Sequence, residues 1–116
     1  MKNRPFSERL GFARTGLRHC WQSESSFRAH IGFAILATLA MIALRPAPVW
    51  WALVGLVVVL VLAFELINSA LERLIDHLHP AIHPEIGIVK DMASAAVLLI
   101  SAGALVVAGA MTVTLF

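Results

Sequence analysis

The chain has 116 residues, of which 59% are hydrophobic and 14% charged, and its formal net charge is +2. Soluble domains are about 45–50% apolar and about 25% charged, and a soluble fold of this length has too little interior to hide so much apolar surface. The composition therefore excludes an ordinary soluble domain and predicts a small protein embedded in lipid.

The first predicted element is an N-terminal helix over about residues 4–26. Its apolar residues recur at steps of three and four: Phe6, Leu10, Ala13 and Leu17. Arg14 and Arg18 are displaced from this stripe, which favours an amphipathic helix in the membrane interface, with its arginines near lipid phosphates. The alternative is a solvated basic arm held near anionic lipid by charge alone. No signal peptide is expected, because this polar segment has no early apolar core.

Three apolar runs follow and predict three transmembrane helices, within about residues 28–45, 48–76 and 88–115. No charged residue occurs in 31–44, 46–64 or 92–116. At about 1.5 Å per residue, the second and third runs can cross a hydrocarbon core of about 30 Å. The first run has only 14 residues, so it needs its flanking residues or a locally thinner bilayer to complete a span.

The connections and the basic residues predict the topology. Pro46 and Pro48 separate the first two runs, and prolines end one helix and start another. Two prolines and a glycine within 77–89 should break the helix on each side of the second loop. The basic residues that precede the first run are Lys2, Arg4, Arg9, Arg14, Arg18 and Arg28. By the positive-inside rule, the N-terminus and second loop are cytoplasmic and the C-terminus is outside.

A polar stripe at the end of the second span is the expected site of chemistry. Its members are Glu65, Asn68, Ser69, Glu72 and Asp76. At about 100° per residue, they lie within about 60° of Glu65 on one helix face. Carboxylates stacked in this way repel one another, and ionisable groups near a membrane core are costly. The stripe therefore predicts a compensating partner, for which a divalent cation is the natural candidate.

Phosphoryl transfer suits this arrangement of carboxylates. Mg²⁺ binds one or two carboxylates together with phosphate oxygens and water, and a further carboxylate orients or deprotonates the attacking hydroxyl. Glu72 and Asp76 lie on the cytosolic side of Glu65, where a nucleotide would approach, whereas Glu65 is nearest the apolar run and a lipid hydroxyl. The alternative is a solvated helix end, which suits Asp76 but not Glu65, because the chain neighbours of Glu65 are apolar.

Other polar residues flank the stripe. Lys90, Asp91 and Ser94 share one side of the third span, where Lys90 suits phosphates as a point charge. Ser94 suits a lipid oxygen or, alternatively, a carbonyl of its own helix. Glu24 precedes the first span on the cytoplasmic side and, taken alone, is an ordinary acid at a helix start. Cys20 is the only cysteine, which excludes an intramolecular disulfide and predicts a small apolar filler.

Taken together, these residues resemble the small prokaryotic diacylglycerol kinases and the related undecaprenol kinases. The matching stretches are Gly16-Leu17-Arg18 with Trp21, Glu24 with Phe27-Arg28, Glu65-Leu66-Ile67-Asn68-Ser69-Ala70-Leu71-Glu72 through Asp76, His83-Pro84, Gly87, and Lys90-Asp91-Met92-Ala93-Ser94-Ala95-Ala96-Val97-Leu98. They run across most of the chain, and the combination of the Glu65–Glu72 and Lys90–Ala96 motifs is highly specific. Neither a phosphate-binding loop motif nor a protein-kinase catalytic loop is present.

The resemblance implies an all-α integral membrane protein of one domain, residues 1–116, with an interfacial helix, three spans and a homotrimer that shares active sites between subunits. It implies phosphorylation of diacylglycerol by ATP with Mg²⁺, at the cytoplasmic face of the bacterial inner membrane and without a nucleic-acid partner. Glu65 would be the general base, and Glu24 and Glu72 would hold Mg²⁺. The nucleotide would meet Phe12, Glu24, Asn68, Glu72, Asp76, His83, Lys90 and Asp91. The lipid would meet Phe27, Arg28, Glu65 and Ser94.

The choice of acceptor has an alternative. His30 stands where some diacylglycerol kinases carry an acid, and its spacing from Phe27-Arg28 resembles the undecaprenol kinase branch. Asn68-Ser69 and Met92-Ala93-Ser94-Ala95 instead resemble the diacylglycerol branch. Undecaprenol is therefore the alternative acceptor. A more remote alternative is a small proton- or ion-conducting membrane protein that uses Glu65 and Asp76 as a relay.

Overall fold

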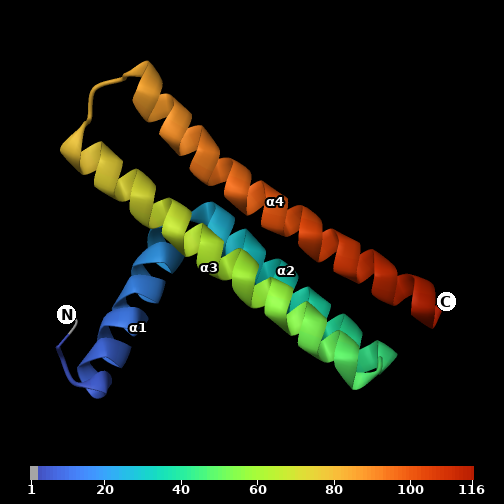
Figure 1. Cartoon of the computed structure of the whole chain (residues 1–116). Helices are drawn as coiled ribbons and strands as arrows, with labels where there is room; N and C mark the ends of the chain where they lie inside the picture. Colours follow the sequence, from blue (N-terminus) through green and yellow to red (C-terminus); the bar gives the residue numbers. More distant parts are fainter. Residues whose placement is uncertain (1–2) are drawn as a thin grey trace.

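The structure is a computed structural model that describes residues 3–116, and it consists of four helices joined by short connections (Figure 1). The helices are α1 (Phe6–Ser23), α2 (Ser25–Leu44), α3 (Pro48–Leu78) and α4 (Pro84–Leu115). The predicted all-α fold is confirmed, and α2, α3 and α4 are each long and apolar enough to cross a membrane.

Helix α3 is the centre of the arrangement because it packs against each of the other three helices. Figure 1 shows α2 and α4 running antiparallel to α3, with α1 leaving at an angle near the start of α2. The last turns of α3 and the first turns of α4 extend beyond the start of α2. The end of the bundle that carries the polar stripe is therefore the end from which α1 departs.

The elbow between α1 and α2 is formed at Glu24, whose backbone is extended with φ −117° and ψ 107°. Carbonyls in the last turn of a helix lack partners within the helix, and the Arg28 guanidinium donates to two of them. It lies 2.6 Å from the oxygen of Trp21 and 3.3 Å from that of Gln22. A cation at a helix C-terminus also interacts favourably with the helix dipole. Arg28 thus fixes the direction in which α1 leaves the bundle.

The turn between α2 and α3 uses a left-handed residue. Arg45 has φ 53° and ψ 55°, and its N–H donates to the carbonyl of Met41 at 2.9 Å. A left-handed residue after the last turn commonly ends a helix, with proline following soon after it. Pro46 is buried beneath the turn, and Pro48 opens α3 in the position where its missing N–H costs nothing.

The second loop is shorter than the sequence suggests. Helix α3 continues to Leu78 and α4 already begins at Pro84, so residues 79–83 form the connection. The early start of α4 has a local cause, because the Nδ1 of His83 accepts a hydrogen bond from the Glu85 N–H at 3.1 Å. This side chain caps the helix, and Pro84 has the preset φ of a first helical residue.

Most of the apolar surface faces outward, as expected of helices whose solvent is lipid. The buried apolar side chains are Cys20, Phe27, Met41, Val61 and Met111. Only 11% of the most apolar window of each candidate span is buried inside the protein. Against this sparsely buried background, a buried charged side chain is an exception that calls for a functional explanation.

Candidate active site

Glu65 is that exception: it is 5% exposed and is the only buried polar or charged residue among residues 3–116. It lies seventeen residues after the start of α3 at Pro48, which corresponds to about 26 Å along a helix. That length is close to the thickness of a hydrocarbon core, about 30 Å, so Glu65 lies near the end of the apolar part of α3 that faces the second loop.

Two further carboxylates act on Glu65 through their charges. Glu24 approaches from the elbow between α1 and α2, and Glu72 lies two turns further along α3. Both side chains are half-buried. We refer to Glu24, Glu65 and Glu72 as the acidic cluster. Its members come from separate parts of the chain, so the fold brings Glu24 to the face that the polar stripe of α3 presents.

Within residues 3–116, no lysine or arginine forms an ion pair with a member of the acidic cluster. Glu24 occupies the N-cap position of α2, but its side chain makes no capping hydrogen bond and remains available to a ligand. Neither Glu24 nor Glu72 takes part in an ion pair within residues 3–116. Half-buried carboxylates without a cationic partner are suited to bind a metal ion.

Asn68 and Ser69 continue the stripe between Glu65 and Glu72. The Oδ1 atom of Asn68 is buried and has no hydrogen-bond partner within residues 3–116. Leaving such an atom unpaired costs about 1–3 kcal/mol, which a bound ligand with a donor group would offset. The Oγ atom of Ser69 accepts from the Cys20 thiol at 3.8 Å, and this contact joins α1 to the stripe.

An ion pair extends the polar surface toward the second loop. The Lys90 ammonium on α4 lies 2.5 Å from Asp76 on α3, and it also experiences the charge of Glu72. The two side chains are 33% and 63% exposed, so the pair is accessible from the cytosolic side predicted by the sequence. Polar groups thus run along α3 from Glu65, which lies beside His30 of α2, through Glu72 to the Asp76–Lys90 pair between α3 and α4.

The remaining predicted site residues differ in whether their side chains are buried, engaged in other contacts, or exposed. Phe27 is 2% exposed and packs in the core. Arg28 is occupied at the elbow, although a guanidinium retains further N–H groups. The Nδ1 of His83 is used in the cap, which leaves Nε2 free. Phe12, Asp91 and Ser94 are exposed, and no hydrogen bond or ion pair within residues 3–116 joins them to the acidic cluster.

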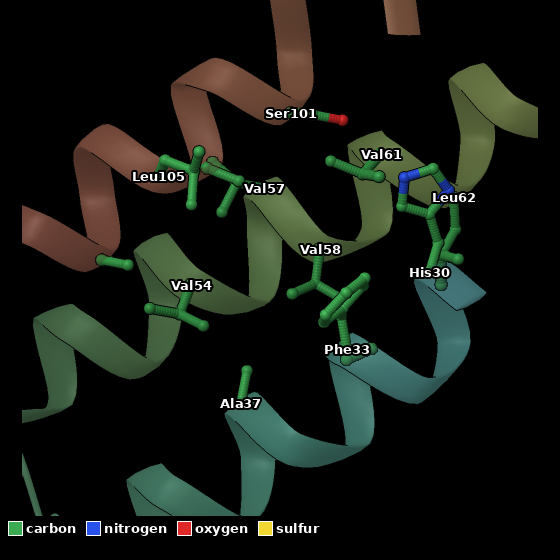
Figure 2. A pocket seen from close by; sticks show the side chains of 13 residues that line it. His30, Phe33, Ala37, Val54, Val57, Val58, Val61, Leu62, Ser101 and Leu105 are labelled. Atoms are coloured by element: carbon green, nitrogen blue, oxygen red, sulfur yellow. The ribbon is translucent and has the colours of Figure 1, made fainter. Parts of the chain in front are cut away.

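The position of His30 beside Glu65 is a feature of the site that the motifs did not indicate. Its Nδ1 lies 3.5 Å from an Oε of Glu65, without the geometry of a hydrogen bond. His30 also lines an apolar cavity of about 430 Å³ between α2, α3 and α4, together with Val61 and Leu62 (Figure 2). At the α4 wall, the buried Oγ of Ser101 has no partner within residues 3–116. Two sequence signals were available: His30 stands where some diacylglycerol kinases carry an acid, and it is an ionisable residue at the margin of an apolar run.

A metal site built from protein ligands alone is absent from residues 3–116, where no group of three or more His, Cys, Asp or Glu side chains is close enough to hold an ion. Mg²⁺ does not need such a group, because it usually takes one or two carboxylates and completes its shell with phosphate oxygens and water. Glu24 and Glu72 would meet that requirement if a nucleotide supplied the other ligands.

Comparisons with known proteins agree with the resemblance seen in the motifs. Residues 11–112 match the family described as prokaryotic diacylglycerol kinase. The chain is 35% identical over 89 residues to the diacylglycerol kinase of Escherichia coli K12, covering 77% of this chain and 73% of that protein. It is 34% identical over 90 residues to the diacylglycerol kinase of Helicobacter pylori, covering 78% and 70%. The Synechocystis diacylglycerol kinase is 32% identical over 101 residues, covering 84% and 57%.

Proposed function

The chain belongs to the prokaryotic diacylglycerol kinase family, and we propose that it transfers the γ-phosphate of ATP to the free hydroxyl of diacylglycerol, giving phosphatidic acid. A kinase of this family is an enzyme that uses ATP as co-substrate and acts on a lipid within the membrane. Diacylglycerol is the proposed acceptor because the relatives at 32–35% identity carry that name.

The observation that carries the proposal is the buried carboxylate of Glu65 at the edge of an apolar span. An acid kept out of water beside apolar side chains reduces the stability of the protein. Such a residue is therefore expected where function requires it. A general base must reach the proton that it removes and must be shielded from competing water. Glu65 meets both needs, since lipid hydroxyls lie at the depth of the headgroups and its carboxylate is 5% exposed.

Glu24 and Glu72 are proposed to hold Mg²⁺ beside this base. The acidic cluster suits a bound cation because none of its carboxylates forms an ion pair with lysine or arginine within residues 3–116. A bound Mg²⁺ would neutralise charge on the transferred phosphoryl group. These two carboxylates orient the metal, and the unpaired Oδ1 of Asn68 is positioned to accept a hydrogen bond from the substrate or a bound water.

The remaining roles follow from the position of each residue at the end of the bundle that carries the polar stripe. Lys90 is proposed to bind phosphate oxygens as a point charge, and Asp76 holds the lysine in place until the nucleotide arrives. Asp91, His83 and Phe12 are proposed to complete the nucleotide site. On the lipid side, Ser94 is proposed to bond an oxygen of the acceptor, with Phe27 and Arg28 shaping the wall at the elbow.

Catalysis in this scheme depends on positioning more than on covalent chemistry. Glu65 accepts the hydroxyl proton as the lipid oxygen attacks the γ-phosphorus, and ADP leaves in line. We further propose that the protein is a homotrimer in the bacterial inner membrane, with the N-terminus and the second loop in the cytoplasm. The excess of basic residues before α2 supports this orientation.

The decisive experiment is an assay on the full-length protein in detergent micelles. ATP consumption and labelled phospholipid are measured with short-chain diacylglycerol, with Mg²⁺ or EDTA, and with the Glu65→Gln variant beside the wild type. The proposal expects turnover that requires both lipid and Mg²⁺ and is lost in Glu65→Gln. Turnover with undecaprenol but not diacylglycerol would move the acceptor to the alternative lipid. Full activity of Glu65→Gln would remove the proposed base.

A further inference from the structure

Glu65 has one potential cationic partner in the structure, and that partner is a histidine on a different helix. The Nδ1 of His30 on α2 lies 3.5 Å from an Oε of Glu65 on α3. The side chains are 25% and 6% exposed, so both are shielded from water. The Nδ1 is buried and has no hydrogen-bond partner within residues 3–116. The Glu65 carboxylate is therefore the polar group with which it can interact.

We propose that His30 is a positioning residue of the lipid kinase, whose protonated imidazole keeps the Glu65 carboxylate ionised and aimed at the lipid hydroxyl. The inference rests on the proposed function of Glu65 as general base. It assigns to His30 a role through Glu65 and not through contact with the phosphate or the metal.

The surroundings of Glu65 explain why a cation is needed there. From the elbow between α1 and α2 it faces Glu24, and along its own helix it faces Glu72. From α1 the Cys20 thiol also shares a charge interaction with it. The titratable groups of α4 are Glu85, Lys90 and Asp91. Lys90 is the one cation among these three, and it forms an ion pair with Asp76. Among residues 3–116, only His30 can supply positive charge next to this acid.

The strength of this interaction follows from where the pair lies. Opposite charges a few ångströms apart attract far more strongly where water is scarce than in bulk solvent. The walls beside His30 are apolar, because Val61 and Leu62 line the cavity next to its ring (Figure 2). In the proposed cycle, Glu65 takes one proton from the lipid hydroxyl and releases it after transfer, and His30 exchanges none.

The test uses His30→Gln, which keeps a polar side chain of similar reach but cannot carry charge. Without the cation, ionised Glu65 is less favoured, so kcat at pH 6.5 should fall about tenfold and the acid side of the pH–rate profile should move up by about one pH unit. At high pH the carboxylate ionises without help, and the variant should recover. His19→Gln, the same change at an exposed histidine of α1, should leave the profile unchanged.

A loss of activity in His30→Gln that is equal at all pH values would overturn the proposal, since it indicates damaged packing. A second measurement does not depend on activity: NMR spectra of ¹³C-labelled histidines in micelles, with the His30 signal assigned from His30→Gln. Replacing Glu65 by Gln should change the ¹³C chemical shift of the His30 ring, and an unchanged shift would refute the pair. Wild-type protein inert toward lipid would refute the proposed function and the positioning role with it, while the NMR result would still decide whether the pair exists.

Discussion

The guanidinium of Arg28 donates a hydrogen bond of 2.6 Å to the backbone carbonyl of Trp21, across the elbow that separates α1 from α2. Arg28→Ala should therefore remove the hydrogen bonds of this side chain and make the elbow between α1 and α2 more mobile. Hydrogen bonds from a charged donor contribute about 1.5–3 kcal/mol, and thermal denaturation in micelles should show a loss toward the lower value because the site is exposed. Limited proteolysis should also show faster cleavage near Glu24.

Arg28→Lys provides the matched comparison for this prediction. A lysine keeps the charge near the helix end, but it lacks the longer, planar guanidinium that reaches the carbonyls of Trp21 and Gln22 through one nitrogen. It should recover part of the stability and little of the protection from protease. If both variants retain wild-type stability while the KM for lipid rises, Arg28 acts on the substrate and the hydrogen bond at the elbow is incidental.

Residue patterns predicted the elements of the fold because they report on local energetics. The uncharged stretch after Pro48 and the helical spacing from Glu65 to Asp76 depend on one helix alone. Contacts between helices depend on crossing angles that no local pattern encodes. For this reason the motifs indicated neither the approach of His30 to Glu65 nor the contact of Cys20 with Ser69.

The second loop illustrates the same limit at a smaller scale. Its two prolines and glycine predicted a break within 77–89; the break is confirmed, but it is short, because α3 continues to Leu78 and α4 starts at Pro84. Proline breaks a helix only when it lies inside one, and at the first position it starts one. The histidine cap that selected this start is a side-chain contact, and composition alone does not reveal it.

The left-handed backbone at Arg45 gives a prediction about stability. A residue with a Cβ pays about 1–2 kcal/mol in this conformation, and glycine does not. Arg45→Gly should raise the free energy of unfolding by about 1 kcal/mol in thermal denaturation, whereas Arg45→Ala should not raise it. Equal effects of the two changes would show that the arginine side chain, not the backbone angle, determines the energy of the turn.

Burial raises the pKa of the Cys20 thiol, and α1 lies outside the spans. Because the thiolate is the reactive form, alkylation of Cys20 by iodoacetamide should require a higher pH than alkylation of an exposed thiol. At neutral pH the rate should be slower than for a model thiol, because less of the Cys20 thiol is ionised. The control is Ser7→Cys in a Cys20→Ala background, which places an exposed cysteine on the same helix. A rate that is lower by a constant factor at every pH would indicate restricted access alone.

Glu72 gives the prediction that most directly separates function from stability. Like charges near one another on a helix destabilise it by about 0.2–0.5 kcal/mol, so Glu72→Gln should leave the protein as stable as the wild type or slightly more so. Its activity should nevertheless fall by about 100-fold or more in kcat/KM, because a metal ligand is lost. Thermal denaturation and initial rates at varied Mg²⁺ and ATP measure the two effects on one preparation.

Glu8→Gln is the matched control, since it removes an exposed carboxylate of α1 that pairs only with Arg4 within residues 3–116. This pair lies at the surface, where an ion pair contributes about 0–1 kcal/mol, so both activity and stability should change little. Glu24→Gln should behave as Glu72→Gln does, with the requirement for Mg²⁺ shifted to higher concentrations. An active Glu72→Gln protein would remove the metal role, and an inactive but strongly destabilised one would show that the acidic cluster supports the fold. An inactive variant of undiminished stability is the result expected when carboxylates are kept close together for a ligand, against their mutual repulsion.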